Sequence, residues 1–243
     1  MNAFYFMAVA SLMSSAIASA ASNAFATALS LPPRNLQSLS PSTLLFSAIL
    51  FVLVIGGAIV LGIPRGGVVV ASEIAQALSL PLDIFLAHKL GVPGHEELAF
   101  GAIADGGSRY LDEEVIRAEC VSPEAIDRVT AQVRQLLNQR ALLYRGRRPP
   151  LQLAGQTVLL VDDGIATGAS VYAAVRALRQ MQPAALILAA PVAPASTCAW
   201  LRSSVDRLVC LHAPQSFYAV GQFYRNFCQV EDDEIVRLLQ PAA

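Results

Sequence analysis

One stretch of the sequence limits the fold more than any other, because a strand-like apolar run leads directly into two adjacent acids and then into a turn. The apolar run is residues 158–161, the acids are Asp162 and Asp163, and the turn continues to Ser170. Residues 169–181 then place apolar side chains on one face of a helix. A buried strand that turns into a helix is typical of an α/β protein, in which ligands bind at the carboxyl ends of the strands.

The turn has the chemistry of a phosphate site. Backbone N–H groups at the start of a helix point outward, where the helix dipole is positive. Gly164 and Gly168 permit unusual backbone angles and close approach of an anion, while Thr167 and Ser170 add hydroxyl donors. The open alternative is an ordinary corner whose polar side chains only cap the helix. The complete string favours a phosphate-binding turn.

Asp162 and Asp163 need a different partner, because carboxylates repel phosphate. Carboxylates accept hydrogen bonds from neighbouring sugar hydroxyls, and Mg²⁺ would offset their charge. A phosphate seat beside an acidic pair fits a ribose that carries a 5-phosphate. We therefore predict a ribose-phosphate site here, with Asp162 and Asp163 also as candidate Mg²⁺ ligands.

The chain from residue 58 onward alternates short apolar strands with amphipathic segments. This alternation predicts an α/β fold, a doubly wound and mostly parallel sheet that is covered on both faces. A long charged helix and the C-terminal segment are expected to form a small hood. We expect strands at residues 58–63, 82–87, 98–104, 157–161, 185–190 and 207–211, and helices at residues 68–78, 123–144 and 169–181.

The charge distribution divides the chain in two. Residues 1–63 contain one charged residue, Arg34, whereas the whole chain has 17 basic and 18 acidic residues. We therefore separate residues 1–57, an uncharged apolar extension, from a domain at residues 58–243. A signal or membrane anchor, a buried segment and a start that is not native are three open interpretations of the extension. Its apolar run at residues 44–55 is shorter than the roughly 20 residues that span a bilayer.

The net charge of −1 provides no general attraction for nucleic acid or for an anionic membrane.

The four cysteines are scattered, with no CxxC pair and no histidine at metal-ligand spacing, which favours reduced thiols in a cytoplasmic protein. Arg145, Arg147 and Arg148 form a small basic run that we interpret as a solvated turn. Contact with a membrane is therefore expected only through residues 1–57.

The string at residues 158–170 resembles the ribose-phosphate signature of type I phosphoribosyltransferases. The similarity extends to residues 62–67, which resemble that family's pyrophosphate loop. Further similarity lies at residues 89–98, 101–107 and 217–224. Over residues 58–240, the chain resembles an uncharacterised branch of predicted bacterial phosphoribosyltransferases.

This resemblance implies Mg²⁺-dependent transfer of 5-phosphoribose from phosphoribosyl pyrophosphate to an acceptor that the sequence does not identify, with release of pyrophosphate. Two positions depart from the family pattern, since Ala166 replaces a proton-handling Asp of purine-salvage members and Ala169 replaces a frequent Lys. Purine salvage by that mechanism is therefore in doubt. The implied pyrophosphate-binding residues are Pro64, Arg65, Gly66 and Gly67, and the implied ribose-phosphate residues are Asp162, Asp163, Gly164, Ala166, Thr167, Gly168, Ala169 and Ser170.

Arg65, Lys89 and His95 are the candidate catalytic side chains. Lys89 and His95 flank a Gly/Pro-rich stretch at residues 91–94 that is suited to a mobile lid, and His95 with Glu96 or Glu97 would be an acid or base. A solvated loop tip is the open alternative for each of these loop residues.

Phe217, Tyr218 and Tyr224 also have two open interpretations, an acceptor-stacking cluster and a satellite of the core. The alternative to an enzyme is a non-catalytic sensor or regulator that binds phosphoribosyl pyrophosphate or a nucleotide, which Ala166 favours. A homodimer is a further expectation.

Overall fold

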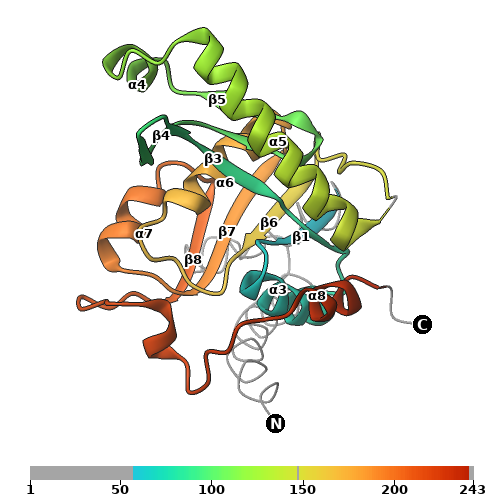
Figure 1. Ribbon diagram of the computed structural model, residues 1–243. Coiled ribbons are helices and arrows are strands. Elements are labelled where there is room, and N and C mark those ends of the chain that lie inside the picture. Colours follow the sequence, from blue (N-terminus) through green and yellow to red (C-terminus); the bar gives the residue numbers. More distant parts are fainter. Residues whose placement is uncertain (1–56, 147, 241–243) are drawn as a thin grey trace, which may run out of the picture.

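The computed structural model describes residues 57–146 and 148–240 (Figure 1). The interpretations of the N-terminal extension concern residues 1–57 and fall outside the described residues except at Gly57. Every helix within residues 57–146 and 148–240 is too short or too polar to cross a lipid bilayer.

A five-stranded sheet forms the centre of the molecule, and all of its strand pairs are parallel. The strand order is β2-β1-β6-β7-β8, so the chain moves to one side from β1 and to the other side from β6. The predicted α/β class with a mostly parallel sheet is confirmed. The strands are β1 (Ala58–Gly62), β2 (Leu82–Ile84), β6 (Thr157–Val161), β7 (Ala185–Val192) and β8 (Arg207–His212).

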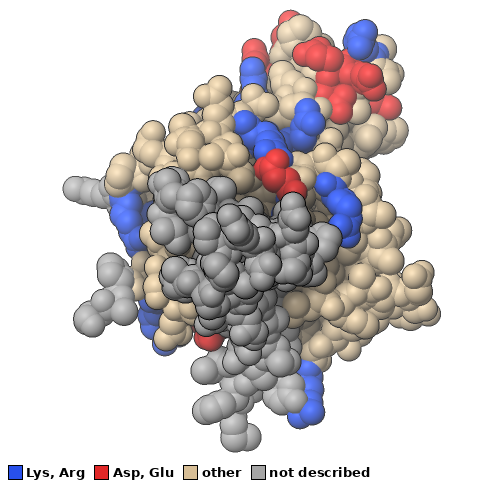
Figure 2. Space-filling view, turned by 180° about the vertical axis from the view of Figure 1, so that it is seen from behind, with Lys and Arg blue, Asp and Glu red and all other residues tan. Residues whose placement is uncertain are grey.

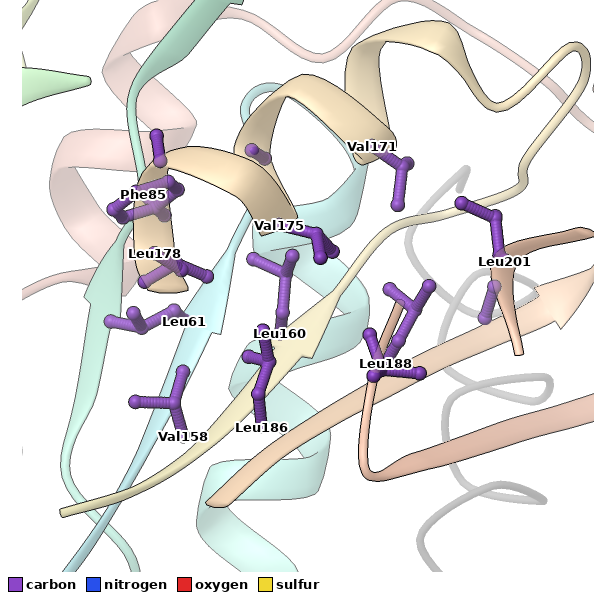
Figure 3. Close-up of a cluster of buried hydrophobic side chains, with 14 of the residues drawn as sticks. Leu61, Phe85, Val158, Leu160, Val171, Val175, Leu178, Leu186, Leu188 and Leu201 are labelled. Atoms are coloured by element: carbon purple, nitrogen blue, oxygen red, sulfur yellow. The ribbon is translucent and has the colours of Figure 1, made fainter. Parts of the chain in front are cut away.

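Helices cover both faces of this sheet, as predicted. Helix α3 (Gly66–Leu78) packs on one face, and α6 (Ala169–Gln180) with α7 (Ala195–Leu201) packs on the other. Successive residues of a strand point to opposite faces, so Leu160 joins the α6 cluster while Leu159 joins the α3 cluster. Figure 3 shows the α6 cluster, in which Val171, Val175 and Leu178 lie over Leu61, Leu160 and Leu186.

A second, antiparallel sheet was not predicted. It has the order β3-β4-β5 and consists of β3 (Ala87–Val92), β4 (His95–Ala104) and β5 (Arg109–Leu111). The single strand predicted at residues 82–87 was wrong, because the chain leaves the first sheet after Ile84 and enters the second at Ala87. Phe85 and Leu86 between them are both buried, so no polar turn marks the crossing.

The hood contains the second sheet, α4 (Glu113–Ala118), α5 (Pro123–Arg145) and α8 (Asp232–Leu238). The long helix and the C-terminal segment lie together there, as predicted, and one apolar cluster joins them to β3 and β4. Ser122 caps α5 by accepting a hydrogen bond from Ala125 N at 3.2 Å. Figure 2 shows acidic side chains gathered at the end of the hood, where Asp112, Glu113 and Glu114 begin α4.

Arg145 corrects the interpretation of the basic run as a solvated turn. Its side chain is buried at the end of α5, and Nε donates to Asp83 Oδ1 at 2.9 Å. This ion pair joins the hood to β2. Arg148 lies at the surface, where Nη2 donates to the carbonyl oxygen of Leu239 at 3.0 Å, and Arg147 lies outside the described residues.

Candidate functional site

Two strand-to-helix turns lie at the carboxyl edge of the parallel sheet. Strand β1 leads into α3, and strand β6 leads into α6. The two strands are neighbours, yet their helices lie on opposite faces and the chain leaves them in opposite directions. Such a topological switch point is where open α/β sheets bind their ligands.

The two turns touch through Gly66 and Gly67. A methyl group placed on Gly66 would lie 2.1 Å from Asp163 Oδ2. On Gly67 it would lie 2.7 Å from the carbonyl oxygen of Val161 and 2.9 Å from Asp162 Cα. Only glycine therefore permits this approach. The structure brings the predicted pyrophosphate loop and the acidic pair into direct contact.

Helix α3 begins at Gly66, two residues earlier than predicted. The first amides of the helix therefore belong to Gly66 and Gly67, beside the acids. Because each helix begins at its turn, the positive end of the α3 dipole lies at the first turn and the positive end of the α6 dipole lies at the second. The peptide bond between Pro64 and Arg65, just before α3, is cis.

Asp162 and Asp163 are half-buried and interact with each other. The backbone N of Asp163 donates to Asp162 Oδ1 at 3.0 Å. Burial, followed by the negative charge of Asp163, raises the pKa of Asp162 well above its ordinary value, and burial raises the pKa of Asp163. A cation or a pair of hydroxyl donors at this point would relieve the repulsion between the two carboxylates.

The acidic pair fits Mg²⁺ in one particular form. Within residues 57–146 and 148–240, no three His, Cys, Asp or Glu side chains converge on one point. Magnesium in phosphate-handling sites is held by one or two carboxylates, with substrate oxygens and water completing its shell. Asp162 and Asp163 therefore suit an ion that binds together with a phosphorylated substrate, and they do not form a complete metal cage.

The second turn, residues 164–170, is open on its outer side. Ala166, Thr167, Ala169 and Ser170 are exposed. Gly168 has φ +82° and lies immediately before α6. Ala169 N donates to Thr167 Oγ1 at 3.5 Å, and binding of an anion at this turn stays a prediction.

The inner side of the same turn is held by β7 and α7. Ile165 N donates to the carbonyl oxygen of Val192 at 2.9 Å, and Thr197 Oγ1 donates to the carbonyl oxygen of Ala166 at 2.9 Å. A methyl group on Gly168 would lie 2.8 Å from the ring of Trp200. Thr197 and Trp200 were not predicted as site residues, because nothing in their local sequence indicates that α7 contacts this turn.

The C-terminal segment contacts both turns. Val220, in the short helix η3 (Val220–Phe223), packs on Gly164, where a methyl group would lie 2.3 Å from its Cγ1. The hydroxyl of Tyr224 donates to the carbonyl oxygen of Asp163, and burial raises the pKa of Tyr224. At the first turn, Arg65 is half-buried. When the side-chain amide of Gln229 is oriented with its oxygen toward the guanidinium, Arg65 Nη1 donates to that oxygen at 2.9 Å. No motif in the sequence indicated Gln229.

The predicted lid is a β-hairpin rather than a loop. Gly91 belongs to β3, and only Pro93 and Gly94 separate β3 from β4. The loop at residues 91–94 was wrongly predicted because Gly91 serves close strand packing, since a methyl group on it would lie 2.7 Å from the carbonyl oxygen of Glu96. The role of this hairpin as a lid stays a prediction. Lys89 lies within β3, half-buried.

His95 starts β4, its side chain is 75% exposed, and Nδ1 lies 3.9 Å from Glu119 Oε2. The structure thus pairs His95 with the end of α4, and the catalytic roles of Lys89 and His95 stay predictions. His88 is a hydrogen-bonded strand residue, with Nδ1 2.8 Å from the carbonyl oxygen of Lys89.

The aromatic cluster divides residue by residue. Tyr224 is buried in the α3 cluster, and Phe217 stacks on Phe223 with ring centroids 5.4 Å apart. These residues are satellite core. Tyr218 is 91% exposed, and Phe227 is exposed beside Tyr224, so these two rings have a free surface for a ligand.

Comparison with known proteins agrees with this geometry. Residues 55–227 match the family model described as a phosphoribosyl transferase domain. Two curated relatives from two strains of Mycobacterium tuberculosis, each named "Putative phosphoribosyl transferase", are 44% identical over 184 residues. The match covers 76% of this chain and 42% of each relative, so the chain spans less than half of their length.

A solved structure shows the same similarity in three dimensions. The crystal structure of TT1426 from Thermus thermophilus aligns with a TM-score of 0.70 at 40% sequence identity. The alignment covers 75% of this chain and 86% of that chain. The family match also includes both turns and the acidic pair. The chain therefore belongs to the type I phosphoribosyltransferase family.

Proposed function

We propose that the protein transfers 5-phosphoribose from phosphoribosyl pyrophosphate to a small-molecule acceptor and releases pyrophosphate. The contact of Gly66 with Asp163 carries this proposal, because it joins two anion-binding turns into one site with the acids between them. The first turn offers Arg65 and the start of α3 to a diphosphate. The second offers the start of α6 to a 5-phosphate. Phosphoribosyl pyrophosphate carries a diphosphate at one end of its ribose and a 5-phosphate at the other, which matches these two turns.

In this proposal the residues divide the substrate between them. Asp162 and Asp163 accept hydrogen bonds from the ribose hydroxyls. The amides of residues 164–170, with the hydroxyls of Thr167 and Ser170, hold the 5-phosphate. The site needs no protein nucleophile, so its contribution is positioning and electrostatic stabilisation.

Charge develops at two places when the bond between ribose C1 and the pyrophosphate oxygen breaks. Negative charge grows on the departing pyrophosphate, where Arg65 and the amides of Gly66 and Gly67 stabilise it. Positive charge grows on the ribose, which the acidic pair faces. Mg²⁺ bound with Asp162 and Asp163 would supply further neutralisation of the diphosphate.

A second function, a non-catalytic sensor of phosphoribosyl pyrophosphate or a nucleotide, is favoured by one observation. Ala166 is exposed in the second turn, at the position where the family resemblance places a proton-handling acid. A methyl group cannot move a proton. Transfer to a purine by that mechanism would therefore lack its acid–base group.

Pyrophosphate release separates the two functions. The protein is incubated with Mg²⁺, phosphoribosyl pyrophosphate and a panel of bases, amines and phenols. Release above the rate without acceptor supports transfer, while binding without release for every acceptor supports the sensor. Absence of binding to phosphoribosyl pyrophosphate, ribose 5-phosphate and pyrophosphate contradicts both. Asp163→Asn should severely weaken binding of ribose 5-phosphate, while Asp127→Asn, at an exposed acid of α5, is the matched control.

We further propose that the protein forms a homodimer in the cytoplasm. Contact with a membrane through residues 1–57 is a separate part of the proposal. Size-exclusion chromatography with light scattering tests the dimer. Fractionation of cells that express either the full chain or a chain starting at Ala58 tests the location. Recovery of both forms in the soluble fraction would contradict membrane contact.

A further inference from the structure

One uncharged side chain, Gln229, contacts the first turn from the C-terminal segment. It lies two residues beyond residue 227, where the match to the family model ends. With its amide oxygen facing Arg65, Gln229 accepts hydrogen bonds from Nη1 at 2.9 Å and from Nη2. The orientation of this guanidinium therefore depends on a residue of the C-terminal segment.

The hood holds the backbone on one side of Gln229. Val230, the next residue, is buried in the apolar cluster of the hood. Asp232 accepts a hydrogen bond from the hydroxyl of Tyr144, in α5, at 2.5 Å. These contacts place Gln229 at a defined distance from the long helix.

The acidic turn holds the segment on the other side. Tyr224 is buried, and its hydroxyl donates to the carbonyl oxygen of Asp163. The segment between Tyr224 and Asp232 therefore runs from the acidic pair to the hood. Gln229 lies within this segment and contacts Arg65. The same segment therefore contacts both the acidic pair and the guanidinium.

An amide suits this contact for a physical reason. The oxygen of Gln229 accepts from two of the five guanidinium donors of Arg65 and carries no negative charge of its own. A carboxylate at the same place would form a bidentate ion pair, which would compete with a diphosphate for the same charge. The amide orients the cation and does not neutralise it.

We infer that Gln229 is a positioning residue for the pyrophosphate end of the site, which presets Arg65 for the diphosphate of the substrate. This inference rests on the proposed function, because it requires Arg65 to bind the diphosphate. The inference predicts different effects on two ligands of the same site. Changes at Gln229 should alter the affinity for pyrophosphate and leave the affinity for ribose 5-phosphate unchanged.

Calorimetric titration of the full chain with pyrophosphate and with ribose 5-phosphate, each with Mg²⁺, tests this selectivity. Gln229→Glu should weaken pyrophosphate binding by about tenfold or more, since the new carboxylate competes for the guanidinium. Gln229→Ala should weaken it by about threefold, because Arg65 is then no longer held. Gln215→Glu, the same charge change at an exposed glutamine of the C-terminal segment, should bind both ligands like the parent protein.

A double-mutant cycle with Arg65→Ala distinguishes positioning from a general structural role. In the Arg65→Ala protein, Gln229→Glu should have little further effect on pyrophosphate binding, because the residue that it acts through is missing. A full-sized effect in that background overturns the inference. Equal weakening of ribose 5-phosphate, or no effect of either Gln229 variant, also overturns it. If the parent protein binds neither pyrophosphate nor phosphoribosyl pyrophosphate, the proposed function fails and the inference fails with it.

Discussion

The two turns of the site start from neighbouring strands, but they are held in place in different ways. The turn at residues 164–170 is held mainly by β7 and α7, the two elements that follow α6 in the chain, and Val220 of the C-terminal segment also packs on its Gly164. The turn at residues 63–67 is fixed by the acidic pair and by Gln229, which lie far away in the sequence.

This difference corresponds to what each turn is proposed to bind. The 5-phosphate stays on the ribose through the reaction, so a turn that the local fold makes rigid suits it. The diphosphate must bind and then leave. A turn that is held by side chains from several parts of the chain can change its conformation as pyrophosphate binds and as it leaves.

Gly66→Ala should have the largest effect, because it separates the two turns. The new methyl group would overlap the carboxylate of Asp163, which must then move out of the site. We expect binding of phosphoribosyl pyrophosphate to weaken by about 100-fold or more, as for loss of several charge-assisted hydrogen bonds. Calorimetry measures the affinity, and circular dichroism verifies that the variant is folded.

The Asp163→Ala protein provides the control for this change. In that background the overlapping carboxylate is absent, so Gly66→Ala should lower the melting temperature less than it does in the parent protein. An equal loss in both backgrounds would show that the two residues do not meet as the structure has them.

Gly168→Ala should have the next largest effect, and it should be felt at the second turn. The residue has φ +82° and lies against Trp200, so alanine is both strained and crowded. We expect ribose 5-phosphate binding to weaken by about tenfold, with a lower melting temperature. Pyrophosphate binding should change less. Equal loss for both ligands would contradict the independence of the two turns.

Thr197→Val should have a smaller effect on the same turn. The substitution removes the hydrogen bond to the carbonyl oxygen of Ala166 and keeps the shape of the side chain. A single neutral hydrogen bond contributes about 1 kcal/mol, so we expect a loss of about fivefold in ribose 5-phosphate affinity. Thr130→Val in α5 is the matched control, and its ligand affinity should equal that of the parent protein. An unchanged affinity in Thr197→Val would show that α7 does not brace the turn.

Asp162→Asn should have the smallest effect and the opposite sign, because it is expected to stabilise the ligand-free protein at neutral pH. The folded state raises the pKa of Asp162, so the folded protein holds this proton more tightly than the unfolded chain does. As pH rises from below the ordinary pKa of Asp through the raised one, the parent protein therefore loses stability relative to the variant.

Melting curves from pH 3 to pH 8 measure this difference. The variant should melt a few degrees higher at neutral pH, and the two curves should converge at the acid end, where both proteins carry a neutral side chain. A parent protein that is the more stable at neutral pH would contradict the prediction. The same variant should bind ribose 5-phosphate more weakly, so the acidic pair would cost stability in exchange for ligand affinity.

Much of the parallel sheet could be predicted, since it depends on short-range patterns. The strand at residues 157–161 was predicted with its observed bounds, because the apolar run at residues 158–161 leads directly into two acids. The strands of the hood were harder to predict. The chain changes sheets across Phe85 and Leu86, where hydropathy alone predicts one continuous strand. Gly91 resembled a loop residue, although it lies in a strand that packs closely on its neighbour.

By itself, the sequence determined that the protein is an α/β member of the type I phosphoribosyltransferase family, and it predicted a phosphate-binding turn beside an acidic pair. All residues of that turn are consecutive, so their local conformations suffice to define it. Only the tertiary structure decided that Gly66 meets Asp163, that α7 contacts the second turn and that Gln229 lies beside Arg65. Those contacts depend on which strands are neighbours and where the chain returns, and long-range packing rather than local periodicity sets both.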